Sequence, residues 1–210
     1  MIQRECFEIQ HYDEIPSYIL GKNILDVGSA DCYGAYHSKH KLHFRTNNYL
    51  GLDIQHFDRP YMQKITRNIF EFETDHKFDT IIMSHVLEHF PITEWSNLFS
   101  KILSLLEPRG FVIINVPYQQ QKAPFVDNEY MHHKTLNIDR NVLLSFLPFQ
   151  KFYYGYNENH DRVIFRNHGE NLFYALARFF YRIIKGHKYS LINTFRQRPV
   201  RIIAIYQKLE

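Results

Sequence analysis

The chain has 210 residues, 45% hydrophobic and 22% charged, with a formal net charge of +3 at pH 7. This composition predicts one globular domain with a sizeable core and excludes a disordered chain. The sequence has no apolar run of about 18 residues, no signal-peptide layout and only two cysteines, so we expect a cytoplasmic protein without a disulfide framework or a membrane-spanning helix.

The charge is unevenly distributed along the chain. Residues 1–161 hold 15 Lys or Arg against 20 Asp or Glu, whereas residues 162–201 hold nine against the single Glu170. Such a split predicts a partner or a charged surface for the C-terminal segment.

The first half of the chain alternates predicted helices and strands. Residues 10–20 predict a short lead-in helix closed by Gly21, 23–27 a strand, 35–43 a helix and 49–53 a second strand. The run 78–84 is short and nearly all apolar, as expected of a strand buried on both faces of a parallel sheet.

The second half continues the pattern. Pro91 begins a predicted helix, and Pro108-Arg-Gly110 turns the chain into a strand at 111–116. We expect a helix at 138–147, an aromatic-rich strand at 149–156 and a last strand at 200–206.

The stretch from Asn23 to Gly34 is the first candidate site. An apolar strand leads into a loop of small and polar residues, including Gly28, and then into a helix. This arrangement makes a cradle for a nucleotide-like ligand. Asp26 would repel a pyrophosphate, so it favours a ligand with positive charge or hydroxyl donors. Asp53, at the end of the next strand, is placed to accept hydrogen bonds from ribose hydroxyls.

Four motifs in order resemble class I S-adenosylmethionine-dependent methyltransferases. They are Asp26-Val-Gly28 with Gly34, Asp53, the run Phe78–Phe90 with its Glu-His pair, and Leu106–Asn115. The resemblance covers residues 20–117. It implies a single doubly wound α/β domain with a mainly parallel, seven-stranded Rossmann-like sheet whose last strand is antiparallel. It also implies S-adenosylmethionine as cofactor and S-adenosylhomocysteine as product.

The resemblance also implies roles for individual residues. The loop would hold the amino-acid moiety of the cofactor and Asp53 the ribose. Asn68 and Ile69 would flank the adenine, and Ser84 and His85 would lie near the transferred methyl group. The cofactor-binding residues expected on this basis are Asp26, Gly28, Ser29, Ala30, Gly34, Asp53, Ile54, Asn68, Ile69 and Ser84. The chain departs from the family at Ala30 and Cys32, where members usually carry glycine.

Histidines are the candidate catalytic residues. A hydroxyl acceptor has to lose its proton, and a histidine can take it near neutral pH. His85 is best placed, at the end of a strand, followed by His132 and His133. The last two lie on a polar, irregular stretch, residues 117–137, that we interpret as a lid over the acceptor.

The run His85-Val-Leu-Glu-His89 allows other interpretations. An inverted zinc-peptidase motif needs both histidines on one regular helix, and Pro91 starts a new helix directly after them. A metal site completed by His132 and His133 would suit zinc-like ions better than magnesium. The simplest interpretation is that Glu88 and His89 satisfy backbone groups at a helix start. On the sequence we assign no metal.

We expect a basic, amphipathic helical insertion at residues 160–198, between the last two strands. Within it, the segment 171–185 predicts an amphipathic helix with an apolar face and a basic face. Such a helix could pack on its own domain, form a homodimer, or bind an anionic membrane surface, which would make the protein peripheral to a membrane.

The sequence therefore predicts methyl transfer to a small-molecule or sugar hydroxyl, most simply O-methylation. A cofactor-binding scaffold without turnover is the alternative, supported by Ala30 and Cys32. A nucleic-acid methyltransferase is the third hypothesis. The acidic body of the chain argues against it, although the basic segment could contact phosphates.

Overall fold

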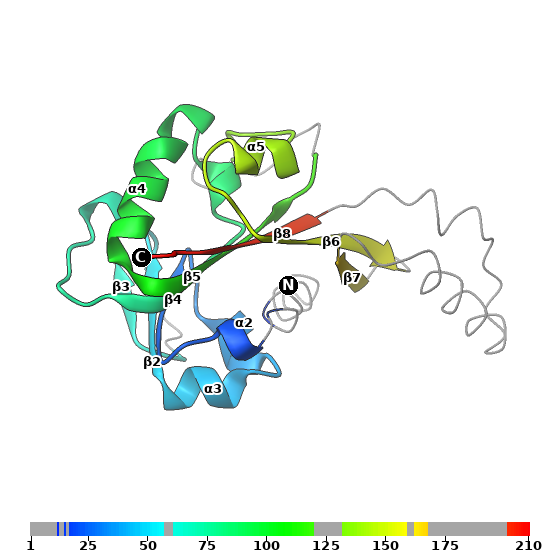
Figure 1. Cartoon of the computed structure of the whole chain (residues 1–210). Coiled ribbons are helices and arrows are strands. Elements are labelled where there is room, and N and C mark those ends of the chain that lie inside the picture. The colour runs from blue at the N-terminus through cyan, green and yellow to red at the C-terminus, as the bar shows by residue number, and fades with distance from the viewer. Residues whose placement is uncertain are drawn as a thin grey trace, which may run out of the picture.

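The computed structural model describes residues 12, 15, 17–56, 61–119, 132–158, 162–167 and 201–210. Its centre is an eight-stranded sheet in the order β3-β2-β1-β4-β5-β8-β6-β7 (Figure 1). The strands are β1 (Asn23–Val27), β2 (Asn48–Asp53), β3 (Lys64–Thr66), β4 (Phe78–Ser84), β5 (Leu106–Pro117), β6 (Lys151–Glu158), β7 (Arg162–Asn167) and β8 (Arg201–Gln207).

The strand directions confirm the predicted fold class. β1 to β5 pair in parallel, and β8 runs antiparallel to both β5 and β6. The order reverses beside β1, because β2 and β3 lie on one side of it and β4 on the other. Ligands bind outside the carboxyl ends of the strands at such a switch point.

The eighth strand was not predicted. β7 pairs antiparallel with β6 and occupies residues 162–167, the start of the stretch expected to be helical. This part of the helical prediction is wrong, because pairing with β6 satisfies the backbone of these residues. The segment 171–185 and most of the expected lid, residues 120–131, lie outside the described residues.

Helices cover both faces of the sheet. α4 (Trp95–Leu105) and α5 (Arg140–Leu144) lie on one face, and α2 (Tyr33–His37) and α3 (Lys41–Thr46) on the other (Figure 1). Two hydrophobic cores result. α4 follows the single turn η4 (Ile92–Glu94), which Pro91 caps, and its buried residues repeat at helical spacing: Trp95, Leu98, Phe99, Ile102 and Leu105.

Several boundaries differ from the prediction. The helix expected at 35–43 is broken into α2 and α3 at Ser38, whose Oγ donates to the Ala35 carbonyl (3.1 Å) and accepts from the His40 N–H (3.2 Å). Such local bonds compete with helix propagation. The turn expected at 108–110 is an irregularity within β5, where Arg109 has φ +64°.

The remaining elements are single turns: η1 (Ser17–Ile19), η2 (Ile69–Glu71) and η3 (Leu87–His89). Within the predicted lead-in helix, η1 is the longest helical segment that the described residues contain. No helix in the described ranges is long and apolar enough to cross a membrane.

The buried face of α4 yields a stability prediction. Trp95 is fully buried, so Trp95→Ala should lower the free energy of unfolding by about 3–5 kcal/mol. The control is Ile92→Ala one turn earlier, where the side chain is 44% exposed and the change should stay within about 0.5 kcal/mol. Urea unfolding of both variants measures the difference, and equal effects would contradict this packing.

Candidate functional site

The strand register brings three predicted positions to one edge of the sheet. Val27 pairs with Leu52 on one side and with Met83 on the other. The next residues along the three strands are therefore Gly28, Asp53 and Ser84. The carboxyl ends of β1, β2 and β4 meet there, as the sequence predicted.

The loop after β1 turns in left-handed backbone conformations. Gly28 has φ +71°, and a Cβ at this position would lie 2.2 Å from Cγ2 of Val86. Ala30 and Cys32 also have positive φ, +49° and +62°. The two departures from the family pattern thus occupy conformations that glycine adopts at lower cost. Gly51 on β2 makes room for the loop, since a Cβ there would lie 2.6 Å from Oγ of Ser29.

Asp53 holds this loop in place. Its Oδ2 accepts from the Ala30 N–H (2.8 Å), and its Oδ1 accepts from the Gln55 N–H (2.9 Å). Lys64 donates from Nζ to the Ala30 carbonyl (3.3 Å). The carboxylate is half-buried, and the neighbouring Ile54 is 48% exposed. A half-buried carboxylate beside an exposed apolar side chain suits a ribose and an adjoining flat ring.

Asp26 is completely buried, and its oxygen Oδ2 accepts from two tyrosines. The Tyr49 hydroxyl donates at 2.5 Å, and the Tyr12 hydroxyl donates to the same atom. Burial and the charge of Asp26 raise the pKa of Tyr49, and they raise the pKa of the Cys32 thiol to about 11. The sequence predicted that Asp26 would face positive charge or hydroxyl donors of a ligand. These two come from the protein itself, and no local pattern pointed to them.

The other predicted cofactor residues differ in exposure. Ser29 is buried under the loop, and Gly34 lies in the buried first half of α2. Asn68 caps η2 by accepting from the Phe70 N–H (3.0 Å), and Ile69 packs in the core beside α4. The Asn68 side chain, which the resemblance assigns to the adenine edge, thus caps this turn.

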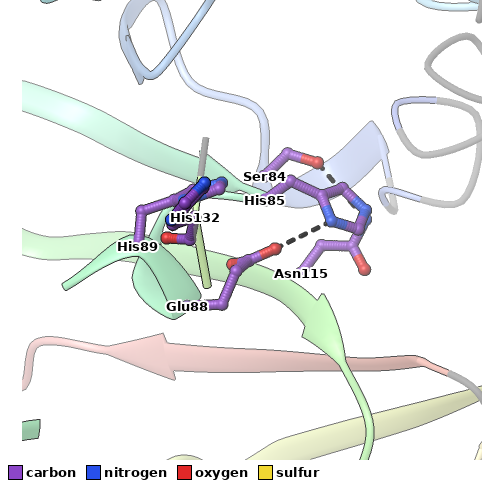
Figure 2. A network of polar contacts seen from close by, with 6 residues as sticks. All are labelled: Ser84, His85, Glu88, His89, Asn115 and His132. Atoms are coloured by element: carbon purple, nitrogen blue, oxygen red, sulfur yellow. Dashed lines mark hydrogen bonds and ion pairs between the residues drawn. The ribbon is translucent and has the colours of Figure 1, made fainter. Parts of the chain in front are cut away.

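His85 and Glu88 form a pair at the end of β4 (Figure 2). His85 has φ +57°, and its backbone N–H donates to the Asn115 carbonyl (2.8 Å). Its Nδ1 lies 2.9 Å from Oε1 of Glu88, a residue with only 1% of its surface exposed. Burial acts to raise the pKa of Glu88, but the hydrogen bond and the imidazoles of His85 and His89 lower it below its ordinary value.

Glu88 is thus a buried carboxylate that orients His85. A 3-10 turn and the left-handed His85 direct its carboxylate to the imidazole. The side chain of His89, by contrast, contacts a backbone group, the carbonyl of His132. The guanidinium of Arg201 also interacts with the charge of Glu88. Burial lowers the pKa of Arg201 on β8 to about 10, and Glu88 opposes that shift.

The other two predicted histidines lie close to this pair. Nδ1 of His89 lies 3.2 Å from the carbonyl oxygen of His132, and the rings of His89 and His133 are 5.1 Å apart, edge to face. Burial lowers the pKa of His133, and Glu88 opposes that shift. The structure therefore brings all three candidate catalytic histidines to the end of β4.

Asn115, at the end of β5, is a site residue that the sequence reasoning missed. It is buried, and its Nδ2 donates to Oγ of Ser84 (3.3 Å) while its carbonyl accepts from the His85 N–H. The sequence did contain a signal for this residue, because Asn115 is a polar residue near the end of an apolar strand.

The strained loop predicts that an Ala→Gly change alters the free energy of unfolding in opposite directions at two positions. Ala30→Gly should raise the free energy of unfolding by about 1 kcal/mol, because glycine relieves the left-handed strain. Ala35→Gly in α2 is the matched control and should lower it by at least about 1 kcal/mol. Thermal unfolding measures both, and a destabilised Ala30→Gly protein would contradict the strain.

Comparisons with known proteins agree on a family. Residues 10–145 match a family model described as a methyltransferase domain. A search of curated protein sequences gives no match. Among solved structures, a SAM-dependent methyltransferase from Archaeoglobus fulgidus is 16% identical, with a TM-score of 0.62 over 98% of this chain and 94% of the other.

Two further structures share the fold. The N-methyltransferase NodS from Bradyrhizobium japonicum is 12% identical, with a TM-score of 0.54 over 100% of this chain and 97% of the other. Magnesium protoporphyrin IX methyltransferase from Synechocystis PCC 6803, with bound SAM, is also 12% identical, with a TM-score of 0.51 over 99% and 79%. The matched domain, the strand order and the loop after β1 together identify this chain as a member of the methyltransferase-domain family with the class I S-adenosylmethionine-dependent fold.

Proposed function

We propose that this methyltransferase acts on the hydroxyl oxygen of a small molecule or sugar, with His85 as the general base. The observation that carries the proposal is the His85–Glu88 pair, in which a buried carboxylate holds an imidazole at the carboxyl end of β4. Amine acceptors that are already neutral need no base in the attacking step, so an oriented imidazole favours a hydroxyl.

The residues at the sheet edge fit S-adenosylmethionine. Asp53 would accept hydrogen bonds from the ribose, the loop 28–32 would lie along the amino-acid moiety, and Ile54 would flank the adenine. When bound, this cofactor supplies a methyl group on a positively charged sulfur. Positioning of the two reactants supplies most of the rate in such an in-line displacement.

Glu88 determines which nitrogen of His85 can act. An ionised carboxylate only accepts hydrogen bonds, so Nδ1 of His85 carries the proton and donates it to Oε1. The lone pair of the neutral ring then lies on Nε2, which would take the proton of the acceptor hydroxyl as the oxygen is methylated. Glu88 would stabilise the resulting imidazolium. His132 and His133 are the second candidates for this step.

Asp53 provides the test of cofactor binding. Asp53→Ala should weaken binding of S-adenosylhomocysteine by about 1–3 kcal/mol, because a carboxylate that accepts from the ribose is lost. Isothermal titration calorimetry measures the dissociation constant. Asp75→Ala, at an exposed position, is the matched control and should bind like the unaltered protein. An unchanged constant for Asp53→Ala would reject this ribose assignment.

His85 provides the test of chemistry. A panel of small-molecule and sugar alcohols, assayed for S-adenosylhomocysteine release, identifies an acceptor, and mass spectrometry locates the methyl group. His85→Gln should then lower kcat about 10²–10⁴-fold and leave the affinity for S-adenosylhomocysteine unchanged. His76→Gln, an exposed histidine, is the control. Tight cofactor binding without turnover on any acceptor would favour the scaffold hypothesis instead.

A further inference from the structure

A second arrangement of side chains lies beside the proposed base. Glu88, His89 and His133 each offer one ligand atom, and these three atoms lie within 4.8 Å of one another. We propose that they form a binding site for one divalent transition-metal ion, with zinc as the best match. On the sequence alone we assigned no metal, because a role of Glu88 and His89 at a helix start was the simpler interpretation.

The carboxylate of Glu88 gives the first independent reason. Its Oε1 lies against Nδ1 of His85, but the other oxygen, Oε2, is buried and has no hydrogen-bond partner among the described residues. A buried carboxylate oxygen without a donor is costly. A cation between Glu88 and the two imidazoles would satisfy it.

The ring of His89 gives the second reason. A carbonyl oxygen only accepts hydrogen bonds, so Nδ1 of His89 carries the proton in its contact with the His132 carbonyl. The lone pair of the neutral ring therefore lies on Nε2. Histidine ligands in metal sites usually donate their other ring N–H to a carbonyl or carboxylate in this way. Glu88 is oriented similarly, by His85.

The backbone holds the two halves of the site together. The N–H groups of Lys134 and Thr135 donate to the Glu88 carbonyl, at 2.8 and 3.1 Å, and the Thr135 hydroxyl donates to the Phe90 carbonyl at 2.7 Å. These bonds fix the segment that carries His133 against η3. Metal–ligand bonds to nitrogen and carboxylate oxygen are about 2.0–2.2 Å, so atoms within 4.8 Å can close on one ion by small side-chain rotations.

The ligand set selects the ion. Two imidazoles and one carboxylate suit zinc and other late first-row divalent ions, whereas magnesium prefers oxygen ligands. Three protein ligands leave a coordination position open, as in catalytic sites. If the proposed O-methylation is correct, an acceptor hydroxyl in that position would lose its proton more readily to His85. Ion binding itself does not depend on that function.

Zinc titration of the full chain tests the site. After treatment with a chelator and dialysis, competition calorimetry should show one Zn²⁺ per chain with a dissociation constant in the micromolar range or below, and Mg²⁺ should not compete. His89→Ala, His133→Ala and Glu88→Gln should each weaken this binding at least about 100-fold. His76→Ala, an exposed histidine away from the cluster, should leave it unchanged. Co²⁺ should give a ligand-field absorption band that the same three variants abolish.

Two results would overturn the proposal: no stoichiometric zinc binding, or binding that the three cluster variants leave intact. Circular dichroism of each metal-free variant shows whether it is folded. Glu88→Gln keeps the size of the side chain and an acceptor for His85, so its effect on zinc binding does not come from a cavity. Calorimetry with S-adenosylhomocysteine on the same samples separates this proposal from the function. Zinc binding without cofactor binding would support the metal site and reject the methyl transfer. Cofactor binding without zinc binding would support the methyl transfer and reject the metal site.

Discussion

The parallel pairing of β1 with both β2 and β4 is the constraint on which the rest of the site depends. Asp26 lies opposite Gly51 on one side and Ile82 on the other. With that register, the three strands end at the same edge, and the chain leaves each of them through a loop that carries polar groups. A slip of one residue would turn every side chain of a strand to the opposite face. The two buried cores, one on each face of the sheet, oppose such a slip.

Three of the six non-glycine residues with positive φ in the described part of the chain lie at this edge. Ala30 and Cys32 after β1 and His85 after β4 all have positive φ without being glycine. Each such residue costs about 1–3 kcal/mol and persists only where its surroundings hold it. Here the Asp53 carboxylate holds Ala30, and the Asn115 carbonyl holds His85. The strain turns the two loops so that, under the proposed function, the backbone of one would face the cofactor and the imidazole of the other would face the acceptor.

The two buried carboxylates, Asp26 and Glu88, have different hydrogen-bond donors. Asp26 receives hydroxyl groups of Tyr12 and Tyr49, which makes it a structural anchor that ties the N-terminal part of the described chain to β1 and β2. Glu88 accepts a hydrogen bond from the imidazole of His85. A carboxylate surrounded by hydroxyls is static, whereas one surrounded by histidines can support proton transfer or hold a cation. Under the proposed function, the chemistry would therefore take place at the end of β4, with structural support at β1.

The sequence by itself determined six of the eight strands, the loop of small residues after β1 and the acid that ends β2. Apolar runs and turn residues are local properties, so 23–27 and 78–84 could be assigned within their own windows. Only the tertiary structure decided which polar groups meet. Tyr12 reaches Asp26 across 14 residues, and His133 joins Glu88 from a distant segment. No periodicity relates such partners, because the sheet register and the path of the intervening loops set their distances. Even the short step from His85 to Glu88 depended on a left-handed residue and a single 3-10 turn, which the local pattern did not specify.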